Sequence, residues 1–259
     1  MPWVLRGLRN GVLTTRYPAQ AESYDPGFHG SVRVSPVDVA SVSGGELACP
    51  THAIAVTDAE ITLDRGLCVL CGRCVAARPD VFSFDSGFEV ASFERDGLVT
   101  GYPNPSGDDV HAVRAELAKR VKALRRSVHI RHVDAGSDGS EEWEVAALVN
   151  PVYDIQRLGV FFTASPRHAD LLLVTGCATS GMAGPLKRTW DAMPEPKIVI
   201  AAGTDAVSGG IISPGYAVSA GVGSVLPVDV WVPGSPPSPF SLLHAIASAL
   251  GMLEDRAGR

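Results

Sequence analysis

Three cysteines packed within residues 68–74 constrain the fold of this chain more than any other feature. They are Cys68, Cys71 and Cys74, and a further cysteine, Cys49, stands directly before a proline. No N-terminal stretch has the long apolar core of a signal peptide, so we expect a cytosolic protein. In that compartment, such a dense cysteine set predicts metal ligands rather than a disulfide framework. One part of the chain is therefore expected to fold around a metal centre.

The pattern of apolar runs, Gly and Pro changes along the 259 residues and predicts two domains. Residues 31–104 hold short apolar runs separated by Gly, Asp and Pro, with four of the five cysteines among them, which predicts a small α+β domain of short strands. From residue 127 onward, strand and helix signals alternate. Runs such as LLLV (171–174) and IVIAA (198–202) are apolar throughout, as a parallel sheet covered on both faces requires. Residues 127–259 are therefore expected to form a flavodoxin-like α/β domain.

Two further segments complete the expected division. Residues 1–30 begin with apolar side chains around Arg6, Arg9 and Arg16. We interpret this segment as a docking arm, and a frayed terminus is the alternative. In residues 105–126, apolar positions recur at spacings of three and four after a Pro- and Gly-containing stretch, which predicts a linker helix.

Composition excludes several classes of function. The balance of 22 Lys and Arg against 28 Asp and Glu gives a net charge of −6, whereas a surface that binds nucleic-acid phosphates is basic. No uninterrupted apolar window is long enough for a transmembrane segment. Neither GxGxxG nor GxxxxGK[ST] is present, so no nucleotide or flavin site is expected.

The cysteine positions resemble those of a two-cluster bacterial ferredoxin module. Such modules repeat C-x2-C-x2-C-x3-C-P, and the fourth cysteine of each run binds the cluster that the other run holds. The positions of this pattern that lack cysteine are Val39, Val42 and Gly45 in the first run and Arg78 in the second. These four losses are the complete ligand set of one cluster.

The cysteines that remain are a complete set for the other cluster: Cys49, Cys68, Cys71 and Cys74. We therefore expect one 4Fe-4S cluster in this domain. A four-cysteine zinc site is the alternative, because four thiolates also satisfy tetrahedral zinc. The C-x2-C-x2-C run that ends in Arg-Pro and the separate Cys-Pro favour the iron–sulfur cluster.

Five strings occur in order along the second domain: GSDGSEEWEVAAL, SPRHADLLLVTG, PKIVIAAG, SGGI and VDVWVPGSPPSP. Together they resemble the small iron–sulfur subunit shared by respiratory complex I and the membrane-bound group 4 nickel-iron hydrogenases, formate hydrogenlyase included. The first domain, with TTRYP ahead of it, resembles the ferredoxin-like partner subunit of the same complexes. The chain is thus similar to a fusion of the two subunits.

In that family, the small subunit binds one cluster through a cysteine pair early in the domain, a cysteine before an SGG turn and a cysteine in a P-G-C-P-P turn. Placed on this chain, the positions are Ser137, Ser140, Asp205 and Ser235. Because sulfide-bridged iron prefers thiolate ligands, the resemblance implies a small-subunit domain that lacks its cluster. We interpret the fifth cysteine, Cys177, as a small buried residue, with a replacement ligand or a reactive thiol as the alternatives.

The resemblance implies an iron–sulfur electron-transfer and scaffold subunit of a membrane-associated oxidoreductase complex, with no catalytic residue of its own. Its expected partners are a hydrogenase-like or complex I-like large subunit and membrane subunits. Its expected location is the cytoplasm, peripheral at the inner face of the membrane. One alternative is a subunit in which Asp205, the serines or Cys177 hold an atypical centre, or a partner supplies ligands. Another is a soluble single-cluster redox sensor or protein-binding module.

Overall fold

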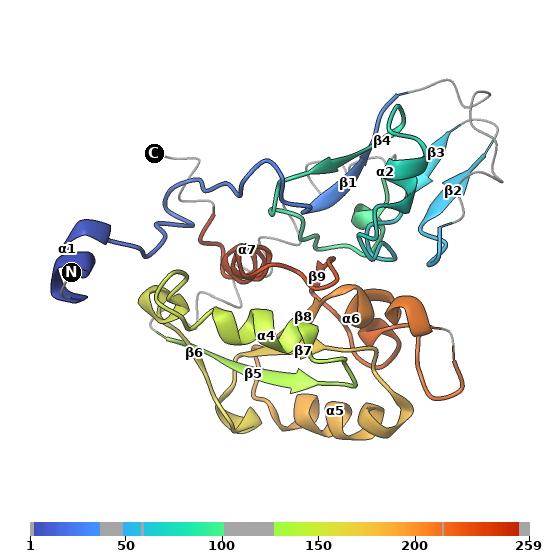
Figure 1. Cartoon of the computed structure of the whole chain (residues 1–259). Coiled ribbons are helices and arrows are strands. Elements are labelled where there is room, and N and C mark those ends of the chain that lie inside the picture. Colours follow the sequence, from blue (N-terminus) through green and yellow to red (C-terminus); the bar gives the residue numbers. More distant parts are fainter. Residues whose placement is uncertain (1–2, 37–48, 58–59, 101–126, 214, 254–259) are drawn as a thin grey trace.

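Separate sets of strands form the two halves of the chain in the computed structural model (Figure 1). The structure describes residues 3–36, 49–57, 60–100, 127–213 and 215–253. The expected linker helix at 105–126 and the positions Val39, Val42 and Gly45 lie outside these residues. The predicted fold class is confirmed, because a parallel sheet with helices follows a region of small antiparallel sheets.

The second domain is built on a five-stranded parallel sheet with the order β6-β5-β7-β8-β9. Its strands are β5 (Val128–Asp134), β6 (Val160–Phe162), β7 (Leu171–Thr175), β8 (Ile198–Ala202) and β9 (Val230–Val232). This is the 2-1-3-4-5 order of flavodoxin-like folds. Every residue of β7 and β8 is buried, as their unbroken apolar sequences predicted.

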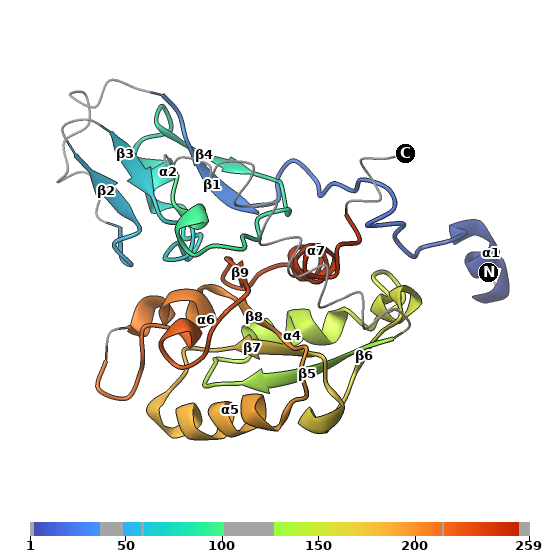
Figure 2. The same ribbon diagram turned by 180° about the vertical axis from the view of Figure 1, so that it is seen from behind.

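Helices cover both faces of this sheet, and they are α4 (Ser140–Ala147), α5 (Ser180–Ala192), α6 (Thr204–Ser208) and α7 (Pro239–Ala249). Figures 1 and 2 show α4 and α7 on one side and α5 on the other. Alternate residues of β7 divide between the two cores: Leu173 packs in the core that holds α7, and Leu172 packs in the core that holds Leu186 of α5. No helix among the described residues is long and apolar enough to cross a bilayer.

The first domain consists of two antiparallel strand pairs and a short helix. Strands β1 (Ser31–Val34) and β4 (Phe82–Asp85) form one pair, and β2 (Ile54–Val56) and β3 (Ile61–Leu63) form the other. Helix α2 (Arg73–Ala77) packs near β4. The apolar run at 89–93, which resembles a strand in sequence, contributes a single bridge from Ser92 to β9.

Short elements complete the described chain. The N-terminal helix is α1 (Trp3–Asn10). The 3-10 turns are η3 (Asp96–Leu98), η4 (Ile155–Leu158), η5 (Pro166–His168), η6 (Gly210–Ile212) and η7 (Val222–Ser224).

The segment that follows α1 is fixed against the second domain. The Thr15 amide donates to the carbonyl oxygen of Val152 at 2.8 Å. Tyr17 is 0% exposed, and its hydroxyl lies 2.8 Å from Nδ1 of His244 on α7. Its ring packs edge-on against Phe240, with centroids 6.1 Å apart. Much of the expected docking arm therefore contacts its own chain, and its role toward a partner stays a prediction.

Several contacts join the first domain to the second, and three of them are specific. The Phe88 and Phe240 rings stack with centroids 4.9 Å apart. Ser92 and Trp231 exchange two backbone hydrogen bonds of 2.9 and 2.8 Å. The Thr204 hydroxyl, in the first turn of α6, donates to the carbonyl oxygen of Cys68 at 3.0 Å. The cysteine run is thereby attached to the carboxyl end of the parallel sheet.

We predict that Tyr17→Ala lowers the free energy of unfolding by about 3 kcal/mol, because it removes a fully buried aromatic ring. Urea unfolding measures the change. Trp3→Ala is the control, since that side chain is 83% exposed and its loss should cost less than about 0.5 kcal/mol. Equal effects of the two substitutions would show that the segment after α1 is not part of the core.

Candidate metal centre

The structure places all four cysteines of the predicted ligand set around one cavity of about 150 Å³. Cys49 precedes β2, Cys68 and Cys71 lie in the loop between β3 and α2, and Cys74 lies in α2. Cys71 is exposed, whereas the other three are partly buried. Cys71 is therefore the most solvent-accessible of the four candidate ligands.

The loop that carries Cys68 and Cys71 turns sharply within a few residues. Leu70 and Gly72 both have positive φ, of 53° and 72°. Glycine adopts this conformation without steric cost, and the turn brings Cys74 back toward the cavity at the start of α2. A Cβ at position 72 would also lie 3.1 Å from the Phe84 ring, so there is little room for a side chain in place of this glycine.

The surroundings of the thiols differ. Burial raises the pKa of Cys68 to about 11 and also raises the pKa of Cys74. Burial acts in the same direction on Cys49, yet hydrogen bonds outweigh it and the pKa of Cys49 is lowered. The Cys49 sulfur accepts the Ala53 amide at 3.4 Å and lies 3.5 Å from the Thr51 hydroxyl. Metal binding deprotonates such thiols, and N–H···S bonds of this kind tune the potential of iron–sulfur clusters.

The cavity distinguishes the two metal centres that the sequence left open. A single zinc ion holds each sulfur at about 2.3 Å, so four thiolates around it close up and leave no cavity. Among the described residues, no group of three or more His, Cys, Asp or Glu side chains is close enough together to bind one single metal ion. The four thiols instead line, together with other residues, a cavity of about 150 Å³, roughly ten times the room that one water needs. The all-thiol set fits a 4Fe-4S cluster better than zinc.

Arg78 stands where the second run of the ferredoxin pattern would have its fourth cysteine. Its guanidinium binds the Asp80 carboxylate through two contacts, Nε to Oδ1 at 2.9 Å and Nη2 to Oδ2 at 2.7 Å. This bidentate ion pair holds the Arg78 side chain against Asp80 on the surface.

A second group of candidate residues lies at the carboxyl ends of the parallel strands, where ligands bind in open α/β sheets. Ser137 and Ser140 follow β5, Asp205 lies in α6 after β8, and Ser235 follows β9. The loops after β8 and β9 are joined, because the Thr204 amide donates to the carbonyl oxygen of Gly234 at 2.7 Å. We refer to this region as the sheet-end site.

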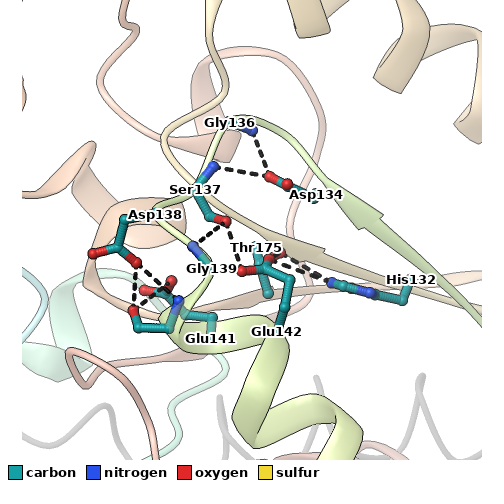
Figure 3. Close-up of polar contacts among 10 residues, drawn as sticks. His132, Asp134, Gly136, Ser137, Asp138, Gly139, Glu141, Glu142 and Thr175 are labelled. Carbon is teal, nitrogen blue, oxygen red and sulfur yellow. Dashed lines mark hydrogen bonds and ion pairs between the residues drawn. The ribbon is translucent and has the colours of Figure 1, made fainter.

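Within the sheet-end site, Ser137 belongs to a separate hydrogen-bond network (Figure 3). Its hydroxyl donates to Oε2 of Glu142 at 2.6 Å. The other oxygen of Glu142 accepts the Thr175 hydroxyl and lies 3.8 Å from Nε2 of His132. Burial lowers the pKa of His132, which favours the neutral imidazole. Ser137 is thus directed toward the end of β7.

Three carboxyl groups, those of Asp138, Glu141 and Asp205, influence one another in the sheet-end site. Burial, with the Asp205 and Asp138 carboxylates adding to it, raises the pKa of Glu141 to about 7. Burial and the neighbouring Asp138 also raise the pKa of Asp205. The Ser140 hydroxyl donates to Oδ1 of Asp138 at 2.6 Å and lies 3.2 Å from Oε2 of Glu141.

Glu141 has little freedom to leave this position. It is 1% exposed, and its carboxyl group lies against Gly203, where a Cβ would be 2.6 Å from Oε1. Sequence reasoning missed Asp138 and Glu141. Asp138 and Glu141 are three residues apart, as Ser137 and Ser140 are, and lie one position further along the chain. The C-x-x-C spacing of the family's cysteine pair therefore fits both pairs equally well.

Cys177 lies next to this site, at the end of β7. It is fully buried, and its sulfur donates to the carbonyl oxygen of Gly136 at 3.0 Å. Burial raises its pKa, so the protonated thiol is favoured. These are the surroundings of a packed structural thiol.

Comparison with known families matches each half of the chain. Residues 139–249 match the family described as NADH ubiquinone oxidoreductase, 20 Kd subunit. Residues 61–118 match the family described as 4Fe-4S single cluster domain. The second match spans three of the four cysteines that line the cavity.

Three individual proteins are similar to this chain. Formate hydrogenlyase subunit 7 of Escherichia coli is 39% identical over 162 residues, which are 62% of this chain and 62% of that protein. The "Probable membrane-bound hydrogenase subunit mbhJ" of Pyrococcus furiosus is 40% identical over 144 residues, 54% of this chain and 86% of that protein. A chain of the membrane-bound sulfane sulfur reductase, an archaeal respiratory membrane complex, is 30% identical with a TM-score of 0.46, over 52% of this chain and 75% of that one.

The chain thus spans less than two thirds of its Escherichia coli relative but most of the Pyrococcus subunit. The resemblance found in the sequence is confirmed for both halves. The chain belongs to the family of the NADH ubiquinone oxidoreductase 20 kDa subunit, with a 4Fe-4S ferredoxin-like domain ahead of that subunit's fold.

Proposed function

We propose that this protein is an electron-transfer and scaffold subunit of a membrane-associated oxidoreductase complex related to complex I and group 4 hydrogenases. It carries one 4Fe-4S cluster, in the first domain, and none in the sheet-end site. The ligands are Cys49, Cys68, Cys71 and Cys74. The observation that carries the proposal is the contrast between a cavity lined by thiols and a sheet-end site lined by oxygen atoms.

A bound 4Fe-4S cluster supplies one-electron transfer. The residues around the four cysteines determine the polarity and solvent exposure of the cluster's site. The amide of Ala53 and the hydroxyl of Thr51 stabilise negative charge on the Cys49 sulfur. Partial burial of Cys68 and Cys74 keeps water from one side of the cavity, and the exposed Cys71 marks the side on which a redox partner can approach.

The sheet-end site is not suited to a cluster. Its side chains offer carboxyl and hydroxyl oxygen, whereas sulfide-bridged iron prefers thiolate. The raised pKa of Glu141, about 7, means that this carboxyl group holds a proton more readily than an ordinary glutamate. The second domain therefore acts as a scaffold, which positions the cysteine loop through the Thr204 bond to Cys68.

The proposed partners are a hydrogenase-like or complex I-like large subunit and membrane subunits, with the protein in the cytoplasm and peripheral at the inner face of the membrane. The support is that two similar proteins are described as subunits of formate hydrogenlyase and of a membrane-bound hydrogenase. A soluble redox sensor, the alternative raised by the sequence, is not favoured by any particular contact in the described residues.

Replacing any one of the four cavity cysteines with serine should abolish or convert the cluster and destabilise the first domain, because a small domain depends on its metal centre for folding. Iron analysis and electron paramagnetic resonance measure the outcome. Cys177→Ala is the matched control and should leave iron content unchanged. Iron loss in Cys177→Ala, or full iron retention in Cys49→Ser, would overturn the ligand assignment.

Cysteines placed in the sheet-end site test which side chains face its centre. The first variant combines Asp138→Cys, Glu141→Cys, Asp205→Cys and Ser235→Cys. The second combines Ser137→Cys, Ser140→Cys, Asp205→Cys and Ser235→Cys. We predict an additional cluster in the first variant only, because Ser137 is directed toward Glu142. Uptake by the second variant alone would show that the serine pair faces the site, and uptake by neither would show that the loops no longer have a cluster-binding shape.

A further inference from the structure

Helix α1 presents apolar side chains to solvent. None of its residues is buried, and Trp3, Leu5 and Leu8 are 83%, 51% and 75% exposed. Figures 1 and 2 show the helix standing apart from both domains, at the far end of the molecule from β2 and β3. Exposed apolar surface of this kind marks a place where something else makes contact.

The distribution of side chains around α1 indicates what that contact is. At about 100° per residue, Trp3, Val4, Leu5 and Leu8 fall on one arc of about 200°. Arg6, Arg9 and Asn10 occupy the remainder. A helix that packs on a folded protein needs an apolar stripe of at least about 100°, and the arc of α1 is about twice as wide. A helix that lies in a lipid interface immerses about half of its circumference, as the arc of α1 would allow.

The charge of this segment is opposite to that of the whole chain. Residues 1–21 contain Arg6, Arg9 and Arg16 and no Asp or Glu, although the chain has a net charge of −6. Arginine on the polar side of an amphipathic helix attracts anionic headgroups, and its long stem lets the guanidinium reach them. Tryptophan favours the depth of the headgroups. The charge therefore complements an anionic lipid surface.

A short connection joins the helix to the body of the protein. Residues 11–13 separate α1 from Thr14, whose hydroxyl donates to the carbonyl oxygen of Pro151 at 2.7 Å. Within and beside this connection, Val12, Leu13 and Val152 are exposed, at 85%, 61% and 41%. Apolar surface thus continues from the helix to the point where it joins the second domain.

We propose that α1, together with Val12 and Leu13, is an in-plane anchor that lays this protein on an anionic phospholipid surface. The anchor deepens the membrane-associated function proposed above and rests on it for its place in the cell. Binding to a protein-free bilayer requires no partner subunit, so the anchor can be tested separately from the complex.

The test uses the full chain, purified anaerobically with its iron, and flotation with lipid vesicles. One set contains equal parts of phosphatidylglycerol and phosphatidylcholine, and the other contains phosphatidylcholine alone. We expect binding to the anionic vesicles to be at least about ten-fold tighter than to the neutral ones and to weaken with added salt. Wild-type protein that fails to float with the anionic vesicles would overturn the proposal.

A pair of double variants isolates the helix. Leu5→Glu with Leu8→Glu should weaken vesicle binding by about ten-fold or more, because it removes apolar area and adds negative charge. Trp143→Glu with Ile211→Glu is the matched control, since it replaces two exposed apolar residues, 78% and 63% exposed, with the same change in net charge. Equal losses in the two variants would overturn the proposal.

Two further measurements separate this outcome from that of the proposed function. Iron content should be the same in both variants, because α1 has no buried residue. If Leu5→Glu with Leu8→Glu lost the large subunit on co-purification while vesicle binding stayed unchanged, α1 would be a protein-docking helix and the lipid assignment would be wrong. A wild-type chain that carries iron yet never co-purifies with a large subunit would instead contradict the proposed function.

Discussion

Three of the four cavity cysteines pack against the hydrophobic core of the first domain as well as being proposed ligands. Within the described part of the domain, that core has five buried residues: Val32, Ala53, Leu63, Val81 and Phe82. Cys49, Cys68 and Cys74 pack directly against it. Domains this small seldom bury enough apolar surface to be stable by packing alone, and bonds from thiolate to metal supply the missing free energy. Loss of one ligand would therefore affect the fold and the redox chemistry together.

The attachment of this small domain to the parallel sheet would let the second domain serve as the proposed scaffold without a cluster of its own. The sheet-end site lies directly beside the cysteine loop, since Thr204 precedes Asp205 and also bonds to the carbonyl oxygen of Cys68. The loops after β8 and β9 hold this contact in place through the bond between Thr204 and Gly234. The second domain thereby fixes the position of the cavity relative to the face of the sheet that α4 and α7 cover.

The sequence was sufficient for the fold class and for the grouping of the cysteines. Unbroken apolar strands such as β7 and β8 are required only in a sheet covered on both faces, and a C-x2-C-x2-C run with a separate Cys-Pro is typical of ferredoxin-like domains.

The sequence was not sufficient for the sheet-end site. Whether the Ser137 pair or the Asp138 pair faces the centre depends on the turn at Gly139, whose φ is 92°, and on Asp134, which binds the amide of Ser137 at 2.8 Å. Neither the turn at Gly139 nor the hydrogen bond from Ser137 to Asp134 produces a periodic pattern in the sequence. The burial of Tyr17 was missed for a related reason, because its partners Phe88 and His244 are distant in sequence.

The central claim is that one chain carries one cluster, and counting clusters tests it most directly. The full chain would be purified without oxygen, its iron and acid-labile sulfide would be measured, and the reduced protein would be quantified by electron paramagnetic resonance. We predict about four iron and four sulfide per chain and a signal from a single paramagnetic centre. About eight iron per chain, or a second signal, would contradict this claim.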